Sequence, residues 1–314
     1  MNLCEVHEKL GTTEQCLEYI EKMRWPDGVK RCPTCGCDKV VKVERKADSK
    51  NSRGWFYLCQ EATCHQQFSP TAGTLFHDSH LPLIKWFQAI ALVLNAKKGI
   101  SAMQLKRDLG VSYKTAWYLY HRIREIMAEG EIPKLGGIVE IDETYVGGKR
   151  RGKKYQGHRD HKICVVGMKQ RGGKLRLFHA PDAKIETLAA YIKEHVSADV
   201  EAIMTDELPA YPKALRISGH DEIIHKTVNH TAGIYSYEDV TTNGIESAFS
   251  LFKRGIVGQY HKISAKHLWR YLNESCYRFN RRDNADAFGD TVRRLCGFPP
   301  LTFASLTSDE SEPF

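Results

Sequence analysis

The chain has 314 residues, 42% of them hydrophobic, which is enough to bury a core, predicts more than one domain and excludes a disordered protein. The net charge of +8 fits a polyanionic partner such as nucleic acid. No apolar run approaches the roughly 18 residues of a membrane span, and the first residues, MNLCEVHEKL, read as neither a signal nor a transit peptide, so we expect a cytoplasmic protein without a membrane partner.

Two close pairs of cysteines stand in the polar segment that includes RCPTCG and LCQEATCHQQFS. Four thiolates from two such turns give the closed tetrahedral shell of a structural Zn²⁺, without which so small a segment could hardly fold. The alternative, free buried thiols, fits close pairs in a polar segment poorly. The neighbouring Cys37 and His65 are alternative ligands that rank below the four cysteines of the pairs. The predicted zinc ligands are Cys32, Cys35, Cys59 and Cys64.

A helical region follows. An apolar helix is predicted from Leu83 to Ala96, and SAMQLKRDLGVSYKTAWYLYHRIREIM divides at Gly110 into two helices, each opened by an N-capping serine, Ser101 or Ser112. This is the pattern of a helix-turn-helix, although a plain helical hairpin reads the same way. The side chains of the second helix that we expect to face outward and contact DNA are Lys114, Thr115, Tyr118 and Arg122.

From Gly136 the hydrophobic periodicity changes from helix to strand. IVEIDETYVGG, KICVVGMKQ and KLRLFHA are three predicted strands, the last two joined in a hairpin across Arg171-Gly172-Gly173. A helix (KIETLAAYIKEHV), a strand ending at Asp206, another strand (EIIHKTV) and a helix opening near Asn243 follow. This order predicts an α/β fold, an RNase H-like mixed sheet with helices on its faces.

Acidic residues fall at matching places in that sheet. Asp142 lies in the first strand, Asp206 just past the fourth, and Glu246 on the helix expected to pack near the same end. Converging carboxylates repel one another unless a divalent cation binds them, so we predict a site for two Mg²⁺ or Mn²⁺ ions. Each residue also has a structural interpretation as a solvated strand residue or a cap, and the adjacent Glu143 and Glu207 are expected to point elsewhere.

The stretch TTNGIESAFSLFKR carries two interpretations at once. Asn243 followed by Glu246 fits a helix capping box, whereas Glu246 and Lys253, seven residues apart, share a helix face from which both can reach a substrate. Lys253 is a candidate phosphate contact or a solvated lysine.

Basic residues are frequent around this predicted site. Such patches either neutralise DNA phosphates or only keep the protein soluble. Three histidines lie near the predicted site in sequence and are expected either to contact DNA ends or to fill turns: His225, His230 and His261. A further basic run, RFNRR (278–282), lies on a later predicted helix. The basic residues predicted to contact DNA are Lys149, Arg150, Arg151, Lys153, Lys154 and Arg254.

Taken together, the chain resembles the bacterial insertion-sequence transposases that carry a zinc ribbon, a helix-turn-helix and a DDE-type catalytic domain. The resemblance covers most of residues 17–282, in the expected order. It is carried by RWPDGVKRCPTCG, FSPTAGTLFHDSHLPLIKWFQAI, IVEIDETYVGGKRRGKK, MTDELPAY and TTNGIESAFSLFKRGIVGQYHKISAKHLWRYLNESCYRFNRR.

The resemblance implies that Asp142 and Asp206 are the first two metal ligands and that Lys253 is the basic residue after the third. The third position is Asn in some members and Glu in others; we favour Glu246, because a carboxylate neutralises Mg²⁺ better than an amide, and keep Asn243 as its rival. The resemblance also implies that the protein recognises terminal inverted repeats, that a water molecule cuts the DNA and that the freed 3′-hydroxyl then attacks target DNA. It further implies a homodimer or larger assembly on DNA and a nucleoid-associated location.

The expected domains are an N-terminal segment with the zinc ribbon (1–75), a helix-turn-helix domain (76–132), an RNase H-like catalytic domain (133–285) and a C-terminal tail (286–314). Two alternative functions remain: a DNA-binding regulator with an inactive RNase H-like domain, and a nuclease of the same fold that cuts without joining. A recombinase that forms a covalent protein–DNA link fits less well, since it needs no carboxylate cluster.

Overall fold

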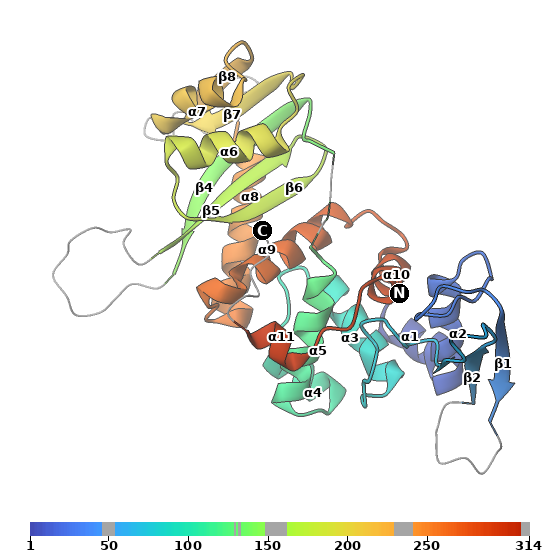
Figure 1. Ribbon diagram of the computed structural model, residues 1–314. Helices are drawn as coiled ribbons and strands as arrows, with labels where there is room; N and C mark the ends of the chain where they lie inside the picture. Colours follow the sequence, from blue (N-terminus) through green and yellow to red (C-terminus); the bar gives the residue numbers. More distant parts are fainter. Residues whose placement is uncertain (46–53, 129, 131–132, 148–161, 229–240, 309–314) are drawn as a thin grey trace. The chain divides into compact units, whose positions relative to one another are not determined.

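The computed structural model describes residues 1–45, 54–128, 130, 133–147, 162–228 and 241–308 (Figure 1). The chain divides into two compact units, Met1–Met127 with Asn284–Phe314, and Ala128–Asp283. The segment expected as a C-terminal tail contributes α10 (Ala287–Gly297) and α11 (Phe303–Thr307) to the first unit. Within the described ranges, no helix combines the length and the apolarity that crossing a membrane requires.

The first unit begins with two short helices, α1 (Leu3–Leu10) and α2 (Thr13–Arg24), followed by a small antiparallel sheet. Its strands are β1 (Val40–Glu44), β2 (Trp55–Cys59) and β3 (Gln67–Phe68). The sheet contacts α2 through Trp55, whose indole Nε1 donates a hydrogen bond of 2.7 Å to Glu21. Two of the predicted zinc ligands lie before β1, one ends β2 and one precedes β3.

Three further helices of this unit are α3 (Leu83–Asn95), α4 (Ala102–Leu109) and α5 (Tyr113–Glu125). The predicted serine caps are present: the hydroxyl of Ser101 accepts from the amide of Gln104, and that of Ser112 from the amide of Thr115. Gly110 ends α4 in the left-handed conformation, with φ of 60°, which favours glycine. The predicted helix, glycine turn and helix are therefore observed, and their role in DNA binding stays a prediction.

The second unit is built on a five-stranded sheet with the order β6-β5-β4-β7-β8. β4 pairs antiparallel with β5, and β5 with β6, whereas the β4–β7 and β7–β8 pairs are parallel. This order confirms the predicted RNase H-like mixed sheet. The strands are β4 (Ile138–Val146), β5 (Ile163–Gln170), β6 (Leu175–Ala180), β7 (Ala202–Asp206) and β8 (Ile224–Val228).

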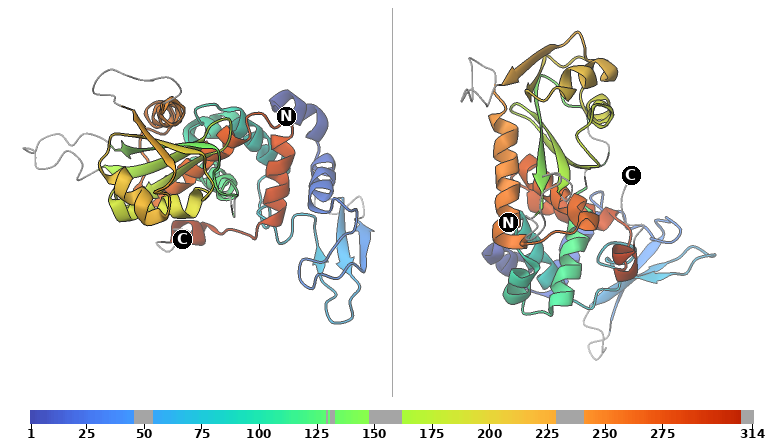
Figure 2. Two further views of the ribbon diagram at one scale, coloured as in Figure 1. Left: turned by 90° about the horizontal axis from the view of Figure 1, so that it is seen from above. Right: turned by 90° about the vertical axis from the view of Figure 1, so that its left-hand side faces the viewer.

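Helices cover both faces of this sheet (Figures 1 and 2). On one face, α6 (Ile185–His195) and α7 (Ala210–Ser218) pack on odd-numbered β4 residues such as Ile141. On the other, α8 (Asn243–Gly255) and α9 (Ala265–Asn280) pack on β5 and β6, and a π-helical turn, Ile256–Tyr260, extends α8. The alternation of β4 therefore turns Asp142 toward the face that α8 covers.

Gly167 of β5 allows α8 to approach the sheet closely. It pairs with Asp142 in the β4–β5 register, and a Cβ atom at this position would lie 2.6 Å from both Ile245 Cδ1 and Phe249 Cζ. Any larger residue would push the helix or these two buried side chains outward. The absence of a side chain at Gly167 thus sets the distance between α8 and the strand that carries Asp142.

Candidate functional site

Two strands bring Asp142 and Asp206 to the same end of the sheet. The parallel register of β4 and β7 ends at the Glu140–Met204 pair, and both aspartates lie two residues further on. Asp206, the last residue of β7, accepts a hydrogen bond of 3.0 Å from the amide of Leu208. Asp142 accepts one of 2.8 Å from the amide of Glu143.

The carboxylates of Asp142, Glu143 and Asp206 have oxygen atoms within 4.8 Å of one another. The expectation that Glu143 points away from the site is therefore wrong. Strand alternation does send Asp142 and Glu143 to opposite faces, but Asp206 lies past the last residues that pair β7 with β4, where both faces of β4 are within reach. Glu143 also accepts a hydrogen bond of 3.0 Å from the buried hydroxyl of Tyr211 on α7, while Glu207 is exposed.

Burial raises the pKa of Asp142 to about 7, with further contributions from the negative charges of Glu143, Asp206 and Glu246. The amide of Glu143 opposes the shift only in part. At neutral pH, part of the metal-free protein thus carries a proton on this carboxyl group. Such mutual repulsion is what a divalent cation, with its preference for carboxylate oxygens, would relieve.

The first turn of α8 differs from the predicted capping box. The N-cap residue is Thr242, Asn243 is the exposed first residue of the helix, and neither side chain accepts from a backbone amide of the helix. Instead, the hydroxyl of Thr242 donates a hydrogen bond of 2.7 Å to Glu246 Oε1. The capping box over Asn243 and Glu246 was therefore the wrong prediction.

A pocket of about 450 Å³ lies between β4 and α8. It contains the predicted residues Asp142, Glu246 and Lys253, so the helix face shared by Glu246 and Lys253 does turn toward Asp142. Asn243 does not line it. Four further residues line the pocket, although nothing in their local sequence pattern marks them as site residues: Thr144, Phe249, Ser250 and Val257.

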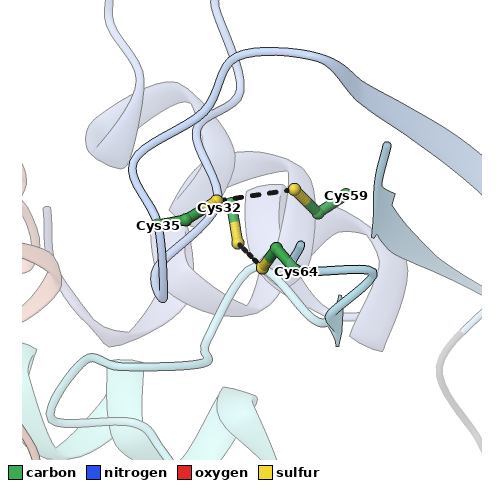
Figure 3. Close-up of side chains that lie close together, drawn as sticks. All are labelled: Cys32, Cys35, Cys59 and Cys64. Atoms are coloured by element: carbon green, nitrogen blue, oxygen red, sulfur yellow. Dashed lines mark hydrogen bonds between the residues drawn. The ribbon is translucent and has the colours of Figure 1, made fainter. Parts of the chain in front are cut away.

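Four cysteines converge in the first unit (Figure 3). The Sγ atoms of Cys32 and Cys64 are 3.7 Å apart, and those of Cys35 and Cys59 are 3.6 Å apart. A tetrahedral zinc with Zn–S bonds of roughly 2.3 Å separates its sulfur ligands by about 3.8 Å, so these four thiols fit a structural Zn²⁺. Cys37 instead contacts the carboxylate of Glu61 and is not one of the four.

Comparison with protein families identifies a known domain in each unit. Residues 134–280 match the ISXO2-like transposase domain, and residues 11–67 match the transposase zinc-ribbon domain. Together these matches span about two thirds of the chain. The chain belongs to the insertion-sequence transposases with an N-terminal zinc ribbon.

A relative of this transposase is an uncharacterized protein in the transposable element ISH50 of Halobacterium salinarum. It is 28% identical over 270 residues, which are 81% of this chain and 86% of the relative. Two solved structures with 10% identity are the Mos1 strand transfer complex (TM-score 0.29, 67% of this chain and 75% of the other) and a pre-cleavage Mos1 transpososome (TM-score 0.24, 65% and 76%). These scores are low, and the fold assignment rests on the strand order and the family match instead.

The expected outward face of α5 in the transposase is not fully open to solvent. Arg122 is only 5% exposed, with its guanidinium 4.7 Å from the ring centre of Trp86 and 5.0 Å from that of Tyr118. The expectation that Arg122 faces outward is therefore wrong: the aromatic rings and the carbonyl of His77 hold it inside, and burial lowers its pKa.

The other three residues of that face are accessible to different degrees. Lys114 is exposed, and its Nζ lies 4.7 Å from the ring centre of Phe303 on α11. The Tyr118 hydroxyl donates to the carbonyl of Leu301, and Thr115 is half-buried beside Ser112. The residues just before and within α11 thus contact the helix that we predicted to read DNA.

Of the basic residues predicted to contact DNA, Arg254 lines the pocket, and its Nε donates to the carbonyl of Ser250. The run from Lys149 to Lys154 and His230 lie outside the described residues. His225 is held by a hydrogen bond of 2.9 Å between its Nε2 and Thr205 Oγ1, and burial lowers its pKa. His261 is exposed at the end of the π-helical turn.

Proposed function

We propose that this transposase cuts DNA at the terminal inverted repeats of its insertion sequence and joins the ends to target DNA at a DDE-type site formed by Asp142, Asp206 and Glu246. The observation that carries the proposal is the convergence of carboxylates from β4, β7 and α8 at one end of the sheet. Converging carboxylates repel one another, and a bound divalent cation would relieve this repulsion.

The donor set fits Mg²⁺ or Mn²⁺. Asp142 and Asp206 have oxygens within 4.8 Å, and Glu246 is close enough to raise the pKa of Asp142. Hard divalent cations take carboxylate oxygens, and the residues that would hold them are Asp142, Asp206 and Glu246. When bound, the cations supply the charge that activates an attacking water or 3′-hydroxyl and that stabilises the leaving oxygen.

Glu246 fits the role of the third metal ligand better than Asn243 does. Glu246 lines the pocket with Asp142, whereas Asn243 is exposed and does not line it. The hydroxyl of Thr242 donates a hydrogen bond of 2.7 Å to Glu246 Oε1. The Thr242 hydroxyl would thus orient the third carboxylate.

The remaining residues of the pocket suit a DNA strand. Lys253 offers an ammonium group seven residues, about two helical turns, from Glu246, which places a positive charge for a phosphate beside the acidic cluster. Arg254 adds a second cation, and the Ser250 and Thr144 hydroxyls can donate to phosphate oxygens. Lys253 and Arg254 would therefore hold the scissile strand against the carboxylates.

DNA is the expected partner of the first unit as well. The zinc ribbon and the helices α4 and α5 would bind the inverted repeats, with Lys114, Thr115 and Tyr118 as candidate contacts. Two transposon ends have to be brought together, so we propose a homodimer or a larger assembly on DNA.

The test is an in vitro reaction with labelled transposon ends and a target plasmid, in Mg²⁺ or in EDTA. The proposal predicts cut ends and joined products in Mg²⁺ only, and neither product from the Asp142→Asn variant. Cutting without any joined product would indicate a nuclease. DNA binding without cutting would indicate a regulator.

A further inference from the structure

A buried carboxylate outside the acidic cluster holds the start of α8. We propose that Glu140 is a positioning residue: with Arg171 it fixes the first turn of α8 and so sets where Glu246 meets Asp142. The inference rests on the proposed function of Glu246 and deepens it. Glu140 lies on β4 two residues before Asp142 and on the same face, and it is 2% exposed.

Both oxygens of Glu140 are engaged by groups that do not belong to a metal site. Oε2 accepts a hydrogen bond of 2.9 Å from the amide of Ile245, and Oε1 accepts one of 3.2 Å from Arg171 Nε. A buried carboxylate is costly unless it is paired and hydrogen-bonded, and these two contacts provide both. Glu140 is accordingly not a member of the carboxylate cluster around Asp142.

The first turn of α8 needs such a partner. The first amides of a helix have no acceptor within the helix, and the side chain of the N-cap residue Thr242 does not accept from them. The hydroxyl of Thr241 accepts from the amide of Asn243, and Glu140, 105 residues earlier in the chain, accepts from the amide of Ile245. A negative charge at a helix N-terminus is also favoured by the helix dipole.

Two further features fix the same turn. The Arg171 guanidinium, bound to Glu140, donates a second hydrogen bond of 3.1 Å to the carbonyl of Thr241, just before the helix. Gly244 leaves the space for this contact, because a Cβ there would lie 2.5 Å from Glu140 Oε2 and 2.7 Å from Lys169 Nζ.

These contacts tie the third carboxylate to the first. Ile245, whose amide Glu140 holds, is the residue before Glu246, so this bond fixes how far α8 is rotated about its axis. Asp142 is on the same strand as Glu140, and a shift of α8 along or about its axis changes the Glu246-to-Asp142 geometry directly. Removal of Glu140 should therefore weaken metal binding and slow the reaction without removing a ligand.

The experiment compares the wild type with Glu140→Ala, Glu140→Gln and Arg171→Ala. The matched control is Glu201→Gln, an exposed glutamate of the same unit. Three quantities are measured on the full-length protein: Mn²⁺ affinity by paramagnetic resonance, the single-turnover cutting rate at saturating DNA, and hydrogen exchange of the Ile245 amide.

For Glu140→Ala we expect Mn²⁺ affinity and cutting rate to fall by about 10- to 100-fold, with DNA affinity unchanged and faster exchange at Ile245. Glu140→Gln retains an acceptor oxygen and should recover part of both losses. If Glu140 only stabilised the fold, its substitution would lower the folded fraction, and the molecules that remain folded would bind Mn²⁺ and cut DNA like the wild type.

A folded Glu140→Ala protein with wild-type Mn²⁺ affinity and cutting rate would overturn the inference. If this variant does not fold, Arg171→Ala decides, since this side chain is 26% exposed and its removal takes away the bonds to both Glu140 and the Thr241 carbonyl; a wild-type result there overturns the inference equally. A wild type that neither binds Mn²⁺ nor cuts would refute the proposed function itself, and the positioning role with it.

Discussion

Replacing Gly167 by alanine should separate α8 from the sheet. The added Cβ would lie 2.6 Å from Ile245 Cδ1 and Phe249 Cζ, whereas ordinary carbon contacts are about 3.5–4.0 Å, so these groups must move by about 1 Å. Both side chains are buried in the core between α8 and the sheet, and overpacking of this kind costs about 1–3 kcal/mol. Since Glu246 lies between them in sequence, it moves with the helix.

Two readouts check this prediction. The melting temperature should fall by about 2–4 °C for each kcal/mol lost, and a 1 Å displacement of Glu246 should slow cutting by about 100-fold. The matched control is Gly136→Ala in the same unit, where an added Cβ meets no atom within 4 Å. If Gly167→Ala melts and cuts like Gly136→Ala, the tight contact of α8 with β5 does not set the site.

Three other predictions concern charge, packing and zinc. Because the pKa of Asp142 is raised to about 7 from 3.8, the metal-free folded protein holds a proton that the unfolded chain has lost between about pH 4 and pH 7. Its free energy of unfolding should therefore fall as pH rises through this window, by up to roughly 4 kcal/mol, and denaturant titrations of Asp142→Asn should show a flatter profile. Arg122→Ala should lower the free energy of unfolding by about 1–3 kcal/mol because this side chain is buried against Trp86, whereas Lys114→Ala should change it by less than about 0.5 kcal/mol; equal losses in thermal melts would contradict the burial of Arg122. Cys59→Ser should abolish zinc binding in metal analysis and unfold the ribbon by circular dichroism, whereas Cys37→Ser should bind zinc normally, and retention of zinc by Cys59→Ser would refute the ligand set.

The sheet of the second unit was predictable because its signals are local. Alternation along β4, the glycines of the β5–β6 turn and the strand ending at Asp206 each mark one element, and their order restricts the topology to few arrangements. The close cysteine pairs are equally local. These patterns predicted that Asp142 and Glu246 lie near the same end of the sheet, and both residues line one pocket.

What the sequence did not reveal depends on contacts between distant residues. The start of α8 is capped by Glu140 across 105 residues, so the local Asn243–Glu246 pattern pointed to a capping box that does not form. Arg122 looks like a surface cation on its own helix, but Trp86 of α3 covers it. Glu143 joins the acidic cluster because Asp206 lies beyond the part of β7 that pairs with β4.

The central claim is that Asp142, Asp206 and Glu246 form one metal-dependent site. The most direct measurement is the Mg²⁺-dependent cutting rate of Glu246→Gln beside Asn243→Ala, two changes in the same helical turn. We predict that Glu246→Gln abolishes cutting and weakens Mn²⁺ binding, while Asn243→Ala, which alters an exposed side chain outside the pocket, cuts at a rate close to that of the wild type. Loss of cutting in Asn243→Ala with an active Glu246→Gln would contradict the account.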